Sequence, residues 1–336
     1  MKLKNLIYLL ILPYLSWSQS GFESILLAVE SDSKKMYQRY MNPLMKGVIY
    51  SSNSGWYNTA KPHKKLGIDL SLRLSTSFVP SSDQVFSIND LDYITTDATN
   101  LPTIIGDSRQ EKLFVTIPKD GLSPEMKTVI KAPKGIKNRL PLGGVPAPML
   151  QLGIGIPFKT ELVLRYSPEY HRKGIDMTLK GIGVKHDLLQ YFGPVDKIPI
   201  NISAFASYSK MKIDYDIQSF SSISGSGQVS QFSINNYNLL ILASYDVFIV
   251  NFYGAIGLSG GNSSFKMLGD YDLEYQTQSN VPITRRLKDP IDMNFKASDF
   301  QTTLGAKFKF LIFSAFIDFT FQDYKTLSAG ISINFR

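Results

Sequence analysis

Few residues of this chain have the types and spacing that catalysis requires. One run, Gly257-Leu258-Ser259-Gly260-Gly261, fits the G-x-S-x-G pattern of serine hydrolases, in which a strand, a sharp turn and a helix expose the nucleophile. Asn262-Ser263-Ser264 follows it and continues as a loop, so the run is interpreted as a Gly/Ser-rich strand end. Because a triad built across strands leaves no local motif, a membrane-embedded hydrolase remains a third functional alternative.

Metal and cofactor chemistry finds no support in the residue pattern. His63, His171 and His186 are isolated and lack the paired spacing of metal ligands. The absence of cysteine excludes disulfides, thiolate metal sites and a lipid anchor on cysteine. The formal net charge of +8 is modest and spread along the chain, which argues against a nucleic-acid partner. We therefore predict a non-enzymatic protein with no metal and no cofactor.

The first residues predict export. Lys2 and Lys4 precede an apolar run from Leu6 to Leu15, and small residues at Ser16 and Ser18 suit cleavage before Gln19. Residues 1–18 are therefore predicted to be a secretory signal peptide. No later run of about 18 apolar residues occurs, so insertion into a membrane would have to use strands.

Alternation of apolar and polar residues predicts ten amphipathic strands. In the last strand Leu327, Ala329, Ile331, Ile333 and Phe335 form one apolar face. Most of the segments exceed the roughly 5 to 6 residues of a soluble strand and suit the roughly 9 to 11 of a tilted membrane strand. They cover 66–79, 148–156, 159–167, 175–186, 198–210, 231–243, 247–259, 298–309, 311–322 and 326–336.

The strand face on which the charged residues lie, together with the lengths of the connections, predicts the fold. Asp69 shares a face with Arg73, and Glu161 with Arg165, as expected where one face meets lipid and the other a lumen. Lys180 instead falls in phase with apolar residues, which indicates a bulge or a strand end. Short connections alternate with long ones, and residues 80–147 can add a hairpin that includes 111–117. The prediction is an all-β, antiparallel transmembrane barrel of 12 to 14 strands, with a secreted β-sandwich as the alternative.

The segment ahead of the strands has a helical period. Phe22, Ile25, Leu26 and Val29 recur at helical spacing, and a second helix, capped by Asp32 or Ser33, is expected to end before Pro43. A barrel of a dozen strands has a wide lumen, so residues 19–65 are predicted to form a plug ahead of a barrel at 66–336. The alternative is an extension packed under the barrel. The plug residues singled out are Met36, Tyr40, Trp56 and Tyr57.

The predicted lumen face mixes charged with apolar side chains, and both kinds are candidates for ligand binding. The charged members can pair with one another and with the plug, which would be a structural role. The apolar members can line a passage for greasy compounds. The lumen-facing residues are Asp69, Arg73, Glu161, Arg165, Phe205, Ile249, Tyr253, Lys307, Phe316 and Asp318.

Three segments carry a resemblance to a known family. Residues Ser54 to His63, Leu101 to Gly106 and Gly181 to Asp187 resemble an uncharacterised family of Gram-negative outer-membrane proteins. That family is similar in layout to fatty-acid and hydrocarbon transporter barrels, which carry an N-terminal hatch and end in an aromatic strand. In this chain Phe335 is penultimate and Arg336 is last. The resemblance implies recognition by the barrel assembly machinery.

The first functional hypothesis is an outer-membrane barrel of a Gram-negative bacterium that binds or passively takes up small hydrophobic compounds. The second is a non-enzymatic partner in surface assembly or secretion. Outer-membrane lipid is the expected surrounding. The basic stretch from Lys119 to Arg139 is either a solvated loop or a contact for lipopolysaccharide phosphates.

Overall fold

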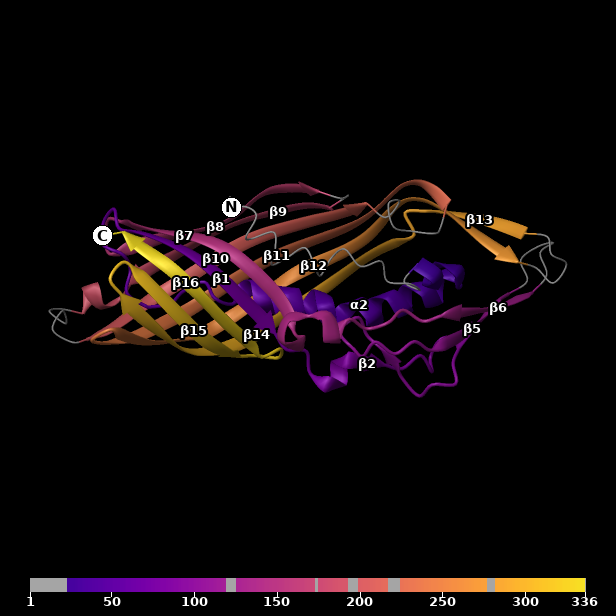
Figure 1. Ribbon diagram of the computed structural model, residues 1–336, viewed down its shortest axis with the longest axis horizontal. Helices are drawn as coiled ribbons and strands as arrows, with labels where there is room; N and C mark the ends of the chain where they lie inside the picture. The colour runs from indigo at the N-terminus through magenta and orange to yellow at the C-terminus, as the bar shows by residue number, and fades with distance from the viewer. Residues whose placement is uncertain are drawn as a thin grey trace.

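The computed structural model describes residues 23–118, 125–172, 175–192, 199–216, 224–276 and 282–335 (Figure 1). The predicted signal peptide, the first residues of the predicted plug, positions 119–124 of the basic stretch and Arg336 lie outside the described residues. Among the helices of the described part, none is long and apolar enough to cross a membrane.

Ten strands of the described part form a closed antiparallel ring. Their order is β11-β10-β9-β8-β7-β1-β16-β15-β14-β12, and β12 pairs back onto β11. The first and last strands along the chain meet at one seam, from Ile68 opposite Phe335 to Ser77 opposite Thr326. The strands are β1 (Ile68–Ser77), β7 (Val145–Ile156), β8 (Thr160–Arg172), β9 (Ile175–Asp187), β10 (Ile200–Asp216), β11 (Ser224–Val247), β12 (Val250–Gln276), β14 (Ile291–Phe310), β15 (Phe313–Phe321) and β16 (Thr326–Phe335).

The ring is smaller than the predicted 12 to 14 strands because the added hairpin does not join it. Residues 111–117 do form a strand, β5 (Lys112–Ile117), but it pairs with β3 (Ile94–Thr95) and β6 (Met126–Lys131) in a separate small sheet. A second small sheet pairs β2 (Val85–Phe86) with β4 (Leu101–Pro102). Figure 1 shows β5 and β6 beyond the barrel end opposite the C-terminus. These strands pair among themselves, so they leave the wall unchanged.

The two ends of the barrel differ. We call the end that carries Phe335 the inner end, and the end with β5, β6 and β13 (Pro282–Lys288) the outer end. The inner end has two-residue turns at 248–249 and 311–312, and a three-residue turn at 157–159. The turn at 311–312 lacks the usual turn residues, and Leu311 adopts a positive φ of 55° there. The fourth connection of the inner end, residues 188–199, is longer, and the longest connection of the wall, residues 78–144, lies at the outer end.

The strands expose one apolar face outward. On β15, Phe313, Ile317 and Phe321 are exposed, whereas Phe316 and Asp318 between them are buried. On β11 the exposed side chains run alternately from Tyr237 to Tyr245, so aromatic residues stand at both borders of the apolar segment. We call this exterior band the apolar belt.

The irregularity predicted near Lys180 is present, in the pairing of β9 with β8. β9 pairs with β10 in continuous register from Asp187 to Ile175. Its register with β8 shifts between Ser167 and Tyr170, one pair beyond that of Tyr166 with Lys180, so a bulge does lie beside Lys180. Lys180 lies on the outer face next to exposed Ile182, one step beyond the apolar belt. The apolar face therefore ends at this height, and the strand continues past it.

The remaining elements are helical. A single long helix, α2 (Glu30–Asn53), runs through Pro43, where the sequence predicted an end. Its N-cap is Val29, without a side-chain cap, so neither Asp32 nor Ser33 has the predicted capping role. Because the wall packs around the helix, tertiary contacts offset the hydrogen bond that proline removes. The short 3-10 helices are η1 (Glu23–Leu27), η2 (Ser81–Gln84), η3 (Lys137–Arg139), η4 (Pro141–Gly143) and η5 (Leu189–Tyr191).

Candidate functional site

Residues 23–65 traverse the ring from the outer to the inner end. Near the outer end, Arg39 donates to both carboxylate oxygens of Asp90 at 2.6 Å, and the Tyr93 N–H donates to Asp32 Oδ2 at 2.7 Å. At the inner end the Leu66 N–H donates to the Gly155 carbonyl at 2.9 Å. Figure 1 shows α2 lying along the barrel between the strands. We call residues 23–65 the plug.

Acid should weaken the outer attachment of the plug. Hydrogen bonding to the Arg39 guanidinium lowers the pKa of Asp90 to about 2, below the unfolded value of about 4. The stabilisation is therefore present above pH about 4 and is lost as the pH falls through about 2. We expect a lower heat-denaturation temperature at pH 2 than at pH 5 in wild type, and a smaller difference in Asp90→Asn. An equal difference in both proteins would contradict this assignment.

The outer half of the plug packs through methionine. Met36 is fully buried, as are Tyr37 and Tyr40, and burial raises the pKa of the Tyr40 phenol. Methionine has three flexible bonds and a polarisable sulfur, so its contacts can rearrange at low cost. Within the described part of the chain, the buried cluster around the helix contains eight methionines, which we call the methionine seam: Met36, Met41 and Met45 of α2, and Met149, Met177, Met211, Met267 and Met293 of the wall.

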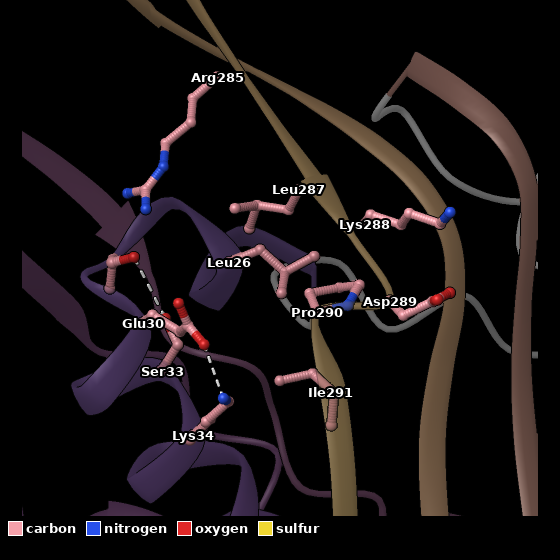
Figure 2. A pocket seen from close by; sticks show the side chains of 11 residues that line it. Leu26, Glu30, Ser33, Lys34, Arg285, Leu287, Lys288, Asp289, Pro290 and Ile291 are labelled. Atoms are coloured by element: carbon pink, nitrogen blue, oxygen red, sulfur yellow. Dashed lines mark hydrogen bonds and ion pairs between the residues drawn. The ribbon is translucent and has the colours of Figure 1, made fainter.

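A small pocket opens at the outer end of the seam (Figure 2). Its volume is about 100 Å³, and it lies between the start of the plug and the β13–β14 segment. Leu26, Leu287 and Ile291 supply apolar walls, and Glu30 pairs with Lys34 at 2.6 Å on the rim. Figure 2 shows the Arg285 side chain directed toward the start of α2. The pocket thus has an apolar floor and a charged rim.

Two wall arginines hold the C-terminal end of α2. Arg165 donates to the carbonyls of Ser52 and Ser54 at 2.7 and 3.0 Å, and Arg73 donates to the Gly55 carbonyl at 2.7 Å. The Arg165 guanidinium also stacks 3.8 Å from the centre of the Trp56 ring. The last turn of α2 has no basic residue, so the wall supplies the cations that the negative end of the helix dipole attracts. We call this pair the arginine latch.

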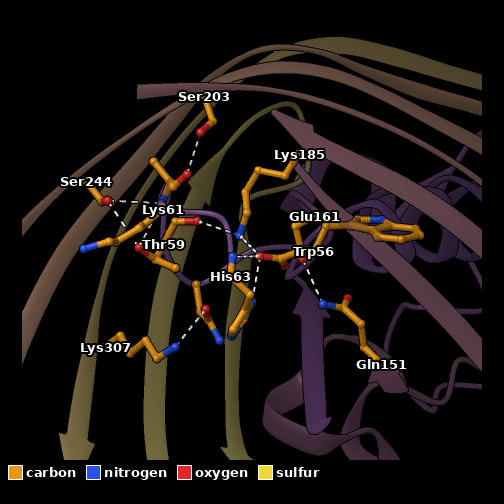
Figure 3. Close-up of polar contacts among 12 residues, drawn as sticks. Trp56, Thr59, Lys61, His63, Gln151, Glu161, Lys185, Ser203, Ser244 and Lys307 are labelled. Carbon is orange, nitrogen blue, oxygen red and sulfur yellow. Dashed lines mark hydrogen bonds and ion pairs between the residues drawn. The ribbon is translucent and has the colours of Figure 1, made fainter. Parts of the chain in front are cut away.

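Below the latch, hydroxyl and amide groups bind the plug segment 57–61 (Figure 3). The Tyr57 hydroxyl donates to Thr303 at 3.0 Å. Thr59 Oγ1 lies 3.2 Å from Ser244 Oγ on β11. Lys307 donates to Asn58 Oδ1 at 3.2 Å. Thr303 and Lys307 belong to β14 and Ser244 to β11, so two strands of the wall hold the segment.

Glu161 is the hub of the inner end. Its Oε2 atom accepts the His63 N–H at 3.0 Å and lies 2.8 Å from His63 Nδ1 and 2.9 Å from Lys185 Nζ. Lys185 reaches the Thr59 carbonyl at 3.4 Å as well. Figure 3 shows the side chains of Lys185, Glu161 and His63 converging beside Trp56. The hub therefore connects the inner end of the plug to β8 and β9.

Most predicted lumen residues lie inside the barrel. The exposed fraction is 5% or less for Asp69, Arg73, Glu161, Arg165, Phe205, Tyr253, Lys307, Phe316 and Asp318. Ile249 is an exception with an exposed fraction of 65%, which contradicts its predicted place. It belongs to the two-residue turn 248–249, where Phe248 has a positive φ of 48° and the alternation restarts at Val250. The predicted plug residues Met36, Tyr40, Trp56 and Tyr57 are all buried.

The sequence interpretation missed His63 and Lys185. Side chains of a strand alternate between its two faces, and Lys180 and Lys185 are an odd number of residues apart. If Lys180 faces outward, the alternation therefore places Lys185 inside. His63 has no comparable signal because the plug segment is irregular there. Ser259 is buried in the middle of β12, without the turn and helix that a nucleophile elbow needs.

Comparisons with known proteins give one family match. A family model described as a family of unknown function (DUF6588) matches residues 1–335. A search of curated proteins finds no match. Ail of Yersinia pestis is 8% identical, with 81% of this chain and 99% of that chain covered and a TM-score of 0.27. The translocator domain of the autotransporter NalP from Neisseria meningitidis is 10% identical, with 91% and 96% covered and a TM-score of 0.28. The toluene transporter TodX of P. putida is 8% identical, with 88% and 93% covered and a TM-score of 0.25.

Proposed function

This chain belongs to the family of unknown function DUF6588, and on that premise we propose that it is a plugged outer-membrane β-barrel that lets small apolar compounds pass when its plug shifts. The observation that carries the proposal is the methionine seam, which belongs to the same buried cluster as Leu26 and Ile291 of the outer pocket. The proposed role requires no enzymatic step, no metal and no cofactor.

The apolar belt supports the membrane location. From Tyr237 to Tyr245 the exposed apolar run of β11 extends for roughly 27 Å along the strand at about 3.4 Å per residue. A tilt of about 40° reduces this to roughly 21 Å, close to the apolar band of about 25 Å of outer-membrane barrels. Three of the four wall connections at the inner end are short, and the longest connection lies at the outer end, which suits an orientation with the inner end in the periplasm.

The composition of the seam supports the class of compound. An apolar solute entering between Leu26 and Ile291 would meet methionine and aromatic side chains along α2. Those side chains can repack around a guest, as methionine-rich surfaces do. The latch and the Glu161 hub then hold the lower plug closed until the plug shifts, so flux would be gated and passive.

Uptake of an apolar dye by cells tests the proposal. N-phenylnaphthylamine fluoresces once it reaches membrane hydrocarbon, and cells that produce the barrel should take it up faster than cells that do not. Leu287→Gln places a polar amide at the pocket and should slow uptake several-fold. Leu142→Gln is the matched control, because Leu142 is 69% exposed and does not line the pocket.

Arabinose uptake, measured in parallel, separates this mechanism from a general pore. The proposal is wrong if dye uptake does not depend on the barrel, or if arabinose and the dye enter equally fast.

A further inference from the structure

A row of outward-facing residues crosses six strands just beyond the apolar belt. Each member is the register partner of the next, so the row follows the barrel wall without a break. Three members are lysines and none is a carboxylate. We call it the lysine row: Tyr166, Lys180, Lys210, Asn235, Asn262 and Lys296.

Lys180 and Lys210 stand directly opposite each other on β9 and β10. Like charges in this relation destabilise a sheet, because the two Cβ atoms are only about 4.5 to 5.5 Å apart. Within the described part of the chain, neither ammonium forms an ion pair. The carboxylates of Asp176 and Asp214 lie four register positions further along the two strands, and Asp214 already pairs with Lys212 at 2.8 Å.

The position of the row relative to the apolar belt suggests which group offsets the repulsion between Lys180 and Lys210. Tyr208 and Tyr237, 52% and 46% exposed, face each other on β10 and β11 at the outer border of the belt. Lys210 and Asn235 follow one outward position later. The Tyr208 hydroxyl donates to Asn235 Oδ1 at 3.2 Å and fixes the border residue to the row. Interfacial tyrosines mark the depth at which hydrocarbon gives way to headgroups.

We propose that Lys180 and Lys210 bind one phosphate group of an outer-leaflet glycolipid between them, with Tyr166 and Asn235 beside it. A phosphate offers several anionic oxygens, so both ammonium groups can donate to it at once and their repulsion becomes attraction to a shared partner. Tyr166, which is 50% exposed and pairs with Lys180, covers one side. The inference rests on the membrane location proposed above.

Binding of lipid A to the purified barrel tests the site. Native mass spectrometry in detergent should detect phosphorylated lipid A on the wild-type protein, and dephosphorylated lipid A should bind about tenfold more weakly. Lys180→Gln with Lys210→Gln should lose the same factor for the phosphorylated form only. Lys112→Gln with Lys127→Gln removes the same charge from the β5–β6 hairpin and should leave binding unchanged. Replacing both row lysines with arginine should retain binding.

Three results would overturn the inference. They are equal lipid binding by the two glutamine double variants, equal binding of both lipid forms by wild type, and full displacement of the lipid by inorganic phosphate. Dye uptake measured on the same variants keeps this test apart from the proposed transport. If wild type binds both lipid forms equally while its dye uptake still depends on the barrel, the lysine-row inference is wrong and the proposed transport stands.

Discussion

Replacing Arg165 with alanine should release the lower plug and raise the permeability of the barrel. The change removes the donors to the carbonyls of Ser52 and Ser54 and to the Gln151 side chain. Each hydrogen bond to a charged group contributes about 1.5 to 3 kcal/mol, and loss of a buried charged partner typically costs about 3 to 5 kcal/mol. A shift of about 3 kcal/mol favours the displaced plug by roughly 150-fold.

Trp56 reports the release directly. The chain contains 2 tryptophans, and Trp17 lies in the predicted signal peptide, so Trp56 would be the single fluorophore of the mature protein. Its emission should shift to longer wavelength in Arg165→Ala as it leaves the guanidinium and the Phe205 ring, which are 3.8 and 6.0 Å away. Current through single barrels in planar bilayers should rise in parallel.

Two variants control for general effects. Arg286→Ala removes a surface arginine paired with Asp272 at 2.6 Å, far from the lumen, and should change neither the emission nor the current. Arg165→Lys keeps the charge but loses the planar fork, so it should lie between wild type and alanine. Wild-type emission and current in a folded Arg165→Ala barrel would refute the latch.

A disulfide between plug and wall should close the barrel. The Oγ atoms of Thr59 and Ser244 are 3.2 Å apart, so cysteines at these positions can bring their sulfurs to bonding distance with modest adjustment. The natural chain has no cysteine that could compete. Oxidised Thr59→Cys with Ser244→Cys should lose dye uptake and should abolish the extra current of Arg165→Ala, and a reductant should restore both.

The matched control joins wall to wall. Ser77 and Thr326, whose hydroxyl oxygens are 2.7 Å apart, bridge β1 and β16 without touching the plug. A disulfide there should leave uptake intact. If the plug disulfide forms and uptake continues unchanged, then passage does not need movement of the plug at Thr59.

The orientation of wall residues was predictable because it depends on period alone. Asp69, Arg73, Glu161 and Arg165 repeat at even spacing, and alternation places them on one face wherever the strand is regular. The prediction that Ile249 faces the lumen was wrong because a two-residue turn interrupts the alternation there. This turn consists of Phe248 and Ile249 and contains no glycine or asparagine, the residues from which a turn is usually predicted.

Other features depend on partners that are remote in the sequence. Pro43 is tolerated inside α2 because the barrel surrounds the helix, which no local pattern around residue 43 reveals. The β5 strand was predicted, but its partners β3 and β6 decide that it stays outside the ring. The latch joins Arg165 to carbonyls more than 100 positions earlier in the chain. Every residue has a main-chain carbonyl, so the sequence does not indicate which of them accept these hydrogen bonds.

The path of the plug also limits the order of assembly. The chain enters the ring at the outer end, fills it, and emerges at Leu66 directly into β1, one half of the seam with β16. A helix with Met36, Tyr37 and Tyr40 packed against the wall could not be threaded through a finished cylinder. The helix must therefore already lie across the unfinished sheet when β16 meets β1. The pairing of these two strands closes the barrel around a helix that is already in place.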